Sequence, residues 1–207
     1  RLIEATGACV TTVINPDDGK PILLFTFTSS LLDGGLFSNV FSQGYDNHWL
    51  LKLSGVGSPL DGNNGVSMNL VSEEDNLSHR RVVMTQGGVS HLRSFAGCIF
   101  DYRLIAPSKL LGNEWPGNQD AESVTAVFTA NVNDEHAYTE NNYRTPAFDG
   151  QAISATKWEI KLFAGSPQQS SGLPDMDLQK LTDIELNLSA TYGSRDDAEP
   201  PSPADCA

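Results

Sequence analysis

Short stretches of alternating apolar and polar residues, separated by turn residues, run along most of the chain. In the clearest one Ile184, Leu186 and Leu188 alternate with polar neighbours, and a similar run surrounds Trp158. A period of two residues is typical of a β-strand with one buried face. Helical periodicity is scarce. Strands are predicted at residues 9–14, 22–28, 49–53, 66–71, 80–85, 98–104, 124–130, 157–163 and 183–191.

Turn-forming residues punctuate these strands. Residues 17–21, 33–35, 61–65 and 86–88 are rich in Asp, Asn, Gln and Gly, which favour tight turns. Many short strands with regular turns predict an all-β fold, which we expect to be an antiparallel, jelly-roll-like β-sandwich of about nine or more strands. A single domain is expected over residues 1–195. The acidic, proline-rich residues 196–207 are expected to form a disordered tail.

Charge narrows the range of partners. The chain has 26 acidic and 13 basic side chains, which gives a formal net charge of -13. An acidic surface repels nucleic-acid phosphates and anionic lipid. It is compatible with a basic partner or a divalent cation, and it also confers solubility by itself. No apolar run approaches the roughly 20 residues of a transmembrane helix, so no membrane span is expected.

The three cysteines do not form a disulfide framework, because their number is odd. Cys9 and Cys98 lie in predicted strands and are expected to be buried. Cys206 lies in the expected tail, where a free thiol is one possibility. One bridge is possible, and the sequence does not choose its partners.

Motifs that carry catalysis are absent from the sequence. It contains no GxSxG nucleophile turn, HExxH helix, P-loop or GxGxxG motif. The four histidines are scattered, and each is expected at the surface or in a structural hydrogen bond. A hydrolase would need a pocket in which histidine and carboxylate converge. We therefore expect a protein that is not an enzyme and has no cofactor, with calcium as the one exception to consider.

Two acidic clusters offer oxygen ligands of the kind that calcium prefers. These are Asp175 with Asp177, and residues 61–64. Neither matches the EF-hand loop. The alternative, which we favour, is that these side chains form local hydrogen bonds within turns.

One tryptophan is a candidate for ligand contact. Trp115 lies in a polar loop beside Pro116 and Gly117, where an exposed ring would offer a flat face to a sugar. Tyr138 and Tyr143 are secondary candidates. The other two tryptophans, Trp49 and Trp158, lie in predicted strands and are expected in the core.

Four segments in order carry a resemblance to a known family. Residues 2–10, 44–56, 146–158 and 178–195 resemble successive motifs in the C-terminal β-rich region of the A components of Tc insecticidal toxin complexes. The resemblance spans nearly the whole chain. Asp149 departs from it, because the family has glutamate at that position. The long helices that form the family's channel are also missing, so no pore is expected from this chain alone.

The resemblance implies a non-enzymatic module that docks the B component of a secreted toxin. We therefore expect a binding or assembly module of an extracellular, toxin-like protein, with a protein partner. The alternative is a carbohydrate-binding module that uses Trp115 to recognise a glycan. A hydrolase of unrecognised type is the least favoured hypothesis.

Overall fold

The computed structural model describes residues 9–29, 48–53, 66–74, 79–94, 98–102, 123–133, 148, 150–165, 174–188 and 190–194. Within these ranges the chain forms strands and one short 3-10 helix, and no α-helix occurs there. Each predicted strand overlaps an observed one, and the last is divided between two. The elements are β1 (Cys9–Ile14), β2 (Pro21–Phe27), β3 (His48–Leu53), β4 (Val66–Ser72), β5 (His79–Arg93), β6 (Ile99–Tyr102), β7 (Ser123–Val132), β8 (Ser154–Phe163), η2 (Leu178–Lys180), β9 (Leu181–Leu188) and β10 (Ala190–Ser194).

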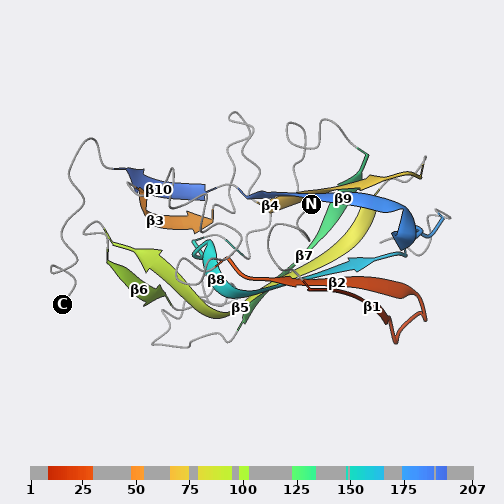
Figure 1. The fold of residues 1–207 in the computed structure, drawn as a ribbon, viewed down its shortest axis with the longest axis horizontal. Coiled ribbons are helices and arrows are strands. Elements are labelled where there is room, and N and C mark those ends of the chain that lie inside the picture. Colours follow the sequence, from red (N-terminus) through yellow and green to blue (C-terminus); the bar gives the residue numbers. More distant parts are fainter. Residues whose placement is uncertain are drawn as a thin grey trace, which may run out of the picture.

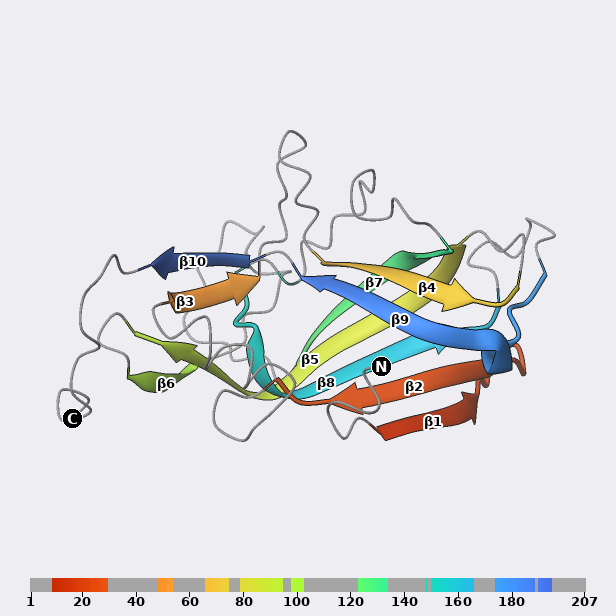
Figure 2. The same ribbon diagram turned by 45° about the horizontal axis from the view of Figure 1, so that its top comes forward.

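Most strands belong to one curled sheet. Its eight strands follow the order β1-β2-β8-β5-β7-β4-β9, with β6 paired to β5 beside this path, while β3 and β10 form a separate two-stranded sheet. Figure 1 shows β4 and β9 in a layer above β2 and β8, with β5 and β7 rising from one layer to the other, so the large sheet curls and has a concave side. Figure 2 shows the same strands from a second direction. The all-β prediction is confirmed. The jelly-roll sandwich is not confirmed, and the sheet is mixed, because β4 runs parallel to β7.

The hairpin of β1 and β2 forms where the sequence predicts a turn. Asn15 Oδ1 accepts a hydrogen bond from the backbone of Asp17 at 3.2 Å, and Asp18 Oδ1 accepts one from Lys20 at 3.0 Å. Gly19 has a φ of 71°, a conformation that glycine adopts without steric cost. These local contacts explain why β1 folds back along β2 with a continuous register.

The predicted turn at residues 86–88 is wrong. These residues lie inside β5, and the register of β5 against β8 shifts between Gly87 and Ser90. Gly88 supplies the bulge with a φ of 71°, and a Cβ there would collide with Thr156 Oγ1. The same hydroxyl accepts a hydrogen bond from Val89 N–H at 2.9 Å. The glycines therefore bend a long strand rather than end it.

Apolar side chains on the concave side of the large sheet form the core. Trp158 is fully buried at 0% exposure, as the sequence predicts. Its ring stacks on Phe27 and meets Phe148 edge-on, and its Nε1–H donates to Ser29 Oγ at 2.8 Å. The side chain of the other expected core tryptophan, Trp49, lies outside the described residues.

The alternation that predicts the last strand is confirmed in β9. Ile184, Leu186 and Leu188 are partly buried and pack against the core. On the opposite face Glu185 accepts a hydrogen bond from Asn69 Nδ2 at 2.8 Å. The contrast follows from strand geometry, because successive side chains of a strand point to opposite faces of the sheet.

The cysteines depart from expectation. Cys9 is exposed and free rather than buried, because the sheet order places β1 at an edge. Cys98 is partly buried and disulfide-bonded, with a partner outside the described residues. Cys206 and the expected tail, residues 196–207, also lie outside them.

Candidate binding site

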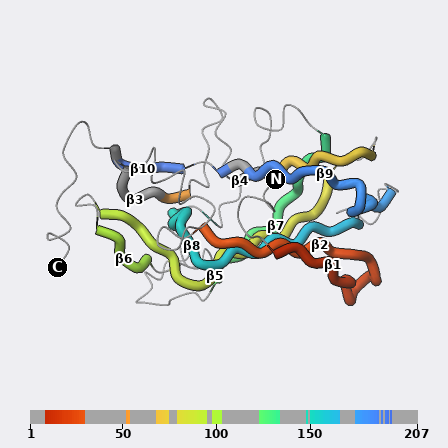
Figure 3. The backbone as a smooth tube through the Cα atoms, viewed as in Figure 1, coloured from red at the N-terminus to blue at the C-terminus, as the bar shows by residue number. Residues whose placement is uncertain are grey.

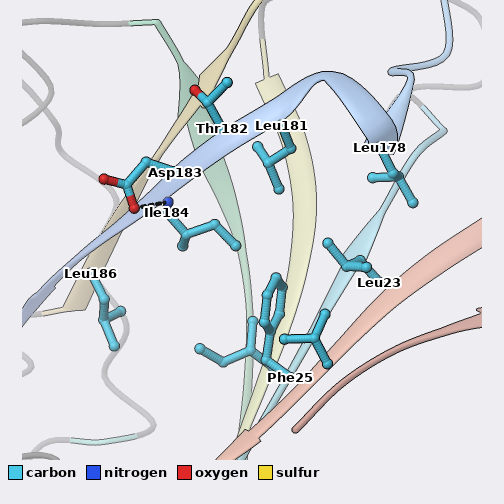
Figure 4. A pocket seen from close by; sticks show the side chains of 10 residues that line it. Leu23, Phe25, Leu178, Leu181, Thr182, Asp183, Ile184 and Leu186 are labelled. Carbon is cyan, nitrogen blue, oxygen red and sulfur yellow. Dashed lines mark hydrogen bonds between the residues drawn. The ribbon is translucent and has the colours of Figure 1, made fainter. Parts of the chain in front are cut away.

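An apolar pocket lies between the two edges of the curled sheet. It has a volume of about 240 Å³ and is walled by β1, β2 and β8 on one side and by η2 and β9 on the other. In Figure 4 the side chains of Leu23 and Phe25 face those of Leu181 and Ile184 across this space. The lining residues are Val10, Leu23, Phe25, Ile160, Leu178, Leu181, Thr182, Asp183, Ile184 and Leu186.

The two polar residues of the pocket are engaged with backbone groups. Thr182 Oγ1 donates to the carbonyl of Val71 at 3.1 Å. Asp183 Oδ1 accepts from the N–H of Ile184 at 2.8 Å, as the dashed line in Figure 4 marks. The remaining eight lining side chains are hydrocarbon. The pocket thus offers apolar contact and no nucleophile, acid or base aimed into it.

The outer edge of β1 is the second candidate feature. Asn15 N–H donates to Lys20 O at 2.8 Å, so this pair belongs to the hydrogen-bonded ladder. In an antiparallel pair every second residue bonds to the partner strand, and the residues between direct their N–H and C=O away from it. The contacts of Pro21, which lies opposite Ile14, are consistent with this pattern. Its carbonyl points away from β1 and accepts a hydrogen bond from Ala164 N at 3.2 Å. The residues that bond to β2 are therefore Cys9, Thr11 and Val13, and those that face the free edge are Val10, Thr12 and Ile14.

This edge is apolar and accessible. No described strand pairs with it, and β1 is the last strand of the sheet on that side. Ile14 is 65% exposed and Val13 is 41% exposed. Val10 belongs to both features, because it lies on β1 and also lines the pocket. The edge and the pocket are therefore contiguous.

The carboxylates considered for calcium have other partners. Asp175 Oδ1 accepts from Lys20 Nζ at 2.7 Å, and this hydrogen bond is the main reason that the pKa of Lys20 is raised. Asp177 accepts from Gln179 N–H at 3.0 Å and caps η2. Within the described ranges no three His, Cys, Asp or Glu side chains are grouped to hold a metal. The calcium site at Asp175 and Asp177 stays a prediction.

A buried arginine anchors the segment that leads into η2. Arg80 is 0% exposed, and its guanidinium donates to the carbonyls of His79 at 2.8 Å and Pro174 at 2.9 Å. Burial lowers the pKa of Arg80, while the negative charges of Asp175 and Glu74 act in the opposite direction. Because the group is enclosed, we interpret it as a structural tether of residues 174–177 to β5.

One histidine has a carboxylate neighbour. His91 on β5 lies opposite Asp101 on β6 and Ser154 on β8, and His91 Nε2 is 3.5 Å from Asp101 Oδ1. His91 Nδ1 makes no hydrogen bond, and both His91 and Ser154 are buried. A catalytic serine must be hydrogen-bonded to its base and open to substrate. The arrangement of Asp101, His91 and Ser154 therefore lacks both of these features of a catalytic triad.

The aromatic candidates Trp115, Tyr138 and Tyr143 lie outside the described residues. The pocket and the β1 edge were not among the sites that the sequence predicts. The sequence contains two signals that relate to these features: residues 9–14, which form β1, carry no charge, and apolar and polar residues alternate at 183–188, in β9. Neither signal reveals that the two segments face each other.

The described residues contain no helix that is long and apolar enough to span a membrane. Comparison with protein-family models, curated proteins and solved structures found no match to this chain.

Proposed function

We propose that this chain is a non-catalytic binding module that docks another protein chain by strand addition at β1. The observation that supports the proposal is the outer edge of β1, with which no described strand pairs. Three residues there direct backbone groups away from β2, beside exposed aliphatic side chains. An extended segment of a partner would bond to these groups and continue the sheet. Main-chain hydrogen bonds would supply affinity, and contacts of alternate side chains would supply specificity.

The composition of β1 supports the same role. Sheet proteins normally protect an edge strand with a lysine, a proline or a bulge, because an open edge invites pairing. The six residues of β1 include no charge and no proline, and their register with β2 is unbroken. This is notable in a chain with 39 charged side chains among 207 residues, counted as 26 acidic and 13 basic.

The proposal agrees with the docking role that the resemblance to Tc toxin A components implies. In that setting the partner would be another component of a secreted, toxin-like assembly, and we include this setting in the proposal. The carbohydrate-binding alternative depends on Trp115, and none of the described residues favours it.

The test uses one proline substitution that blocks the edge without breaking the hairpin. Thr12→Pro removes an N–H that faces the free edge, and proline is tolerated at such positions. Thr11→Pro removes an N–H that bonds to β2, so it should destabilise the hairpin and serves as the structural contrast. Circular dichroism and thermal unfolding should show Thr12→Pro folded like the wild type.

Binding is measured with nine-residue peptides selected from a phage-displayed random library on the wild-type chain. We expect the selected peptides to alternate apolar and polar residues, and to bind Thr12→Pro at least tenfold more weakly by fluorescence anisotropy. Val127→Lys is the matched surface control. The Val127 side chain is 60% exposed and lies on the face of the sheet away from the concave side, so this variant should bind the peptides as the wild type does. Peptides that bind Thr12→Pro as tightly as the wild type would contradict docking at β1.

A further inference from the structure

We propose that the pocket between β1–β2 and β9 is a binding site for an uncharged aliphatic molecule, or aliphatic chain, of roughly eight carbons. The proposal rests on the volume, lining and openness of the cavity. It is independent of strand addition at the edge of β1, because a small molecule in the pocket needs no contact with the free backbone groups.

The walls of the pocket are fixed by hydrogen-bonded ladders. On one side β2 is paired with both β1 and β8, and on the other side β9 is paired with β4 from Val66 to Ser72. β1 and β9, the two edges of the sheet, are not paired with each other. Because each wall is held by its own strand pairing, a small side-chain adjustment does not close the cavity, and it stays available to a guest.

Burial differs between the floor and the walls of the pocket. Phe25 and Ile160 form a buried floor, with exposures of 4% and 2%. Val10, Leu23 and Ile184 are only partly buried. The pocket therefore has a buried apolar base and partly exposed walls, and a guest can enter without unfolding of the sheet. Figure 3 shows that the backbone of β9 lies apart from that of β1 and β2.

The volume sets the size of the guest. Cavities of about 150 Å³ lined by aliphatic and aromatic groups bind benzene, so a volume of about 240 Å³ admits a larger molecule. At roughly 30 Å³ for each carbon-sized group, which is the share of one water molecule in the liquid, the pocket holds about eight such groups. A medium-length aliphatic chain fits this size.

The charge distribution selects against anions. Thr182 Oγ1 and Asp183 Oδ1 already bond to backbone groups, and the residues that line the pocket include no cation for an anionic headgroup. Transfer of an unpaired ion into an apolar cavity is costly. The net charge of -13 adds repulsion for a carboxylate. An alcohol or another neutral aliphatic group is therefore preferred over a fatty-acid anion.

The test is a series of straight-chain alcohols from butanol to dodecanol. Affinity for the full chain is measured by displacement of the uncharged fluorescent probe N-phenyl-1-naphthylamine. Burial of each additional methylene should tighten binding about fourfold. This gain should stop near octanol, where the pocket is full. Octanoate should bind at least tenfold more weakly than octanol.

Two variants of β1 locate the site. Val10→Phe places a larger side chain inside the pocket and should weaken octanol at least tenfold. Val13→Phe makes the same change on the opposite face of the same strand and should leave octanol binding unchanged. Failure of the wild type to bind any alcohol, an affinity that rises without a plateau, or equal binding by the two variants would each overturn the proposal.

The outcome is separable from docking at β1. Thr12→Pro should retain octanol binding even though it loses strand addition. Alcohol binding without peptide binding would support the small-molecule site in the pocket and would contradict the proposed docking at β1. Peptide binding that Val10→Phe abolishes, together with no alcohol binding, would mean that the pocket receives a side chain of the docked segment, and would overturn the small-molecule proposal.

Discussion

The concave side of the large sheet has a closed half and an open half. Around Trp158 the packing is complete, because the indole lies between aromatic rings and its N–H is hydrogen-bonded to Ser29. Between β1 and β9 the same sheet presents partly buried aliphatic side chains around an unfilled space. The difference indicates that stability is concentrated in one half, which leaves the other half free to bind.

Truncating one buried side chain in each half tests most directly whether the two halves differ in their contribution to stability. Trp158→Ala removes a fully buried ring, and we expect the free energy of unfolding to fall by about 3–5 kcal/mol. Ile184→Ala enlarges a pocket that is already open, so the fall should be about 1 kcal/mol. Urea unfolding followed by circular dichroism measures both. Equal losses would show that the two halves do not differ in energetic role.

The polar centre of the closed half provides the second prediction. Ser29 Oγ donates to Ile153 O at 2.6 Å and accepts from Trp158 Nε1 and from Ala155 N, at 2.8 and 3.0 Å. Ser29→Ala leaves two buried N–H donors without this acceptor. Each unsatisfied buried donor costs about 1–3 kcal/mol, so for the two donors we expect a loss of at least about 2 kcal/mol in the free energy of unfolding.

A double-mutant cycle isolates this contact. Trp158→Phe keeps an aromatic ring and removes the N–H donor, so Ser29→Ala should cost less in that background than in the wild type. Chemical denaturation of the four proteins gives the coupling. A serine substitution with the same cost in both backgrounds would mean that the indole hydrogen bond contributes nothing to stability.

The sequence predicts strands better than their arrangement. The residue pattern at 183–188 is local, and it correctly assigns Ile184 and Leu186 to the core-facing side of β9. The local chemistry of Gly87-Gly88 favours a turn, yet β5 continues through these residues. Its partners, β8 on one side and β7 then β6 on the other, come from distant segments. Non-local pairing outweighs the turn preference there.

The pocket was unpredictable for the same physical reason. Leu23 and Ile184 come together only because β1–β2 and β9 lie on opposite edges of a sheet that curls. Curvature depends on the order of all strands and on the bulge in β5, and a residue pattern contains neither. The exposure of Cys9 follows from the same strand order. An apolar stretch of sequence has the same residue pattern whether its strand lies at the edge or in the centre of a sheet.

The smallest expected effect concerns the ion pair that joins the walls of the open half. Lys20 lies in the β1–β2 hairpin and binds Asp175, which precedes η2 and β9. The pKa of Lys20 is raised above its ordinary value of 10.5, so the contact stabilises the fold at neutral pH and is lost as pH rises through the raised pKa. Lys20→Met should therefore lower the thermal midpoint slightly at pH 7 and leave it unchanged relative to the wild type near pH 12. Because both side chains are substantially exposed, the shift should be small and should shrink further in high salt. An equal shift at pH 7 and in alkaline solution would mean that Lys20 acts through packing of its alkyl chain and not through its charge.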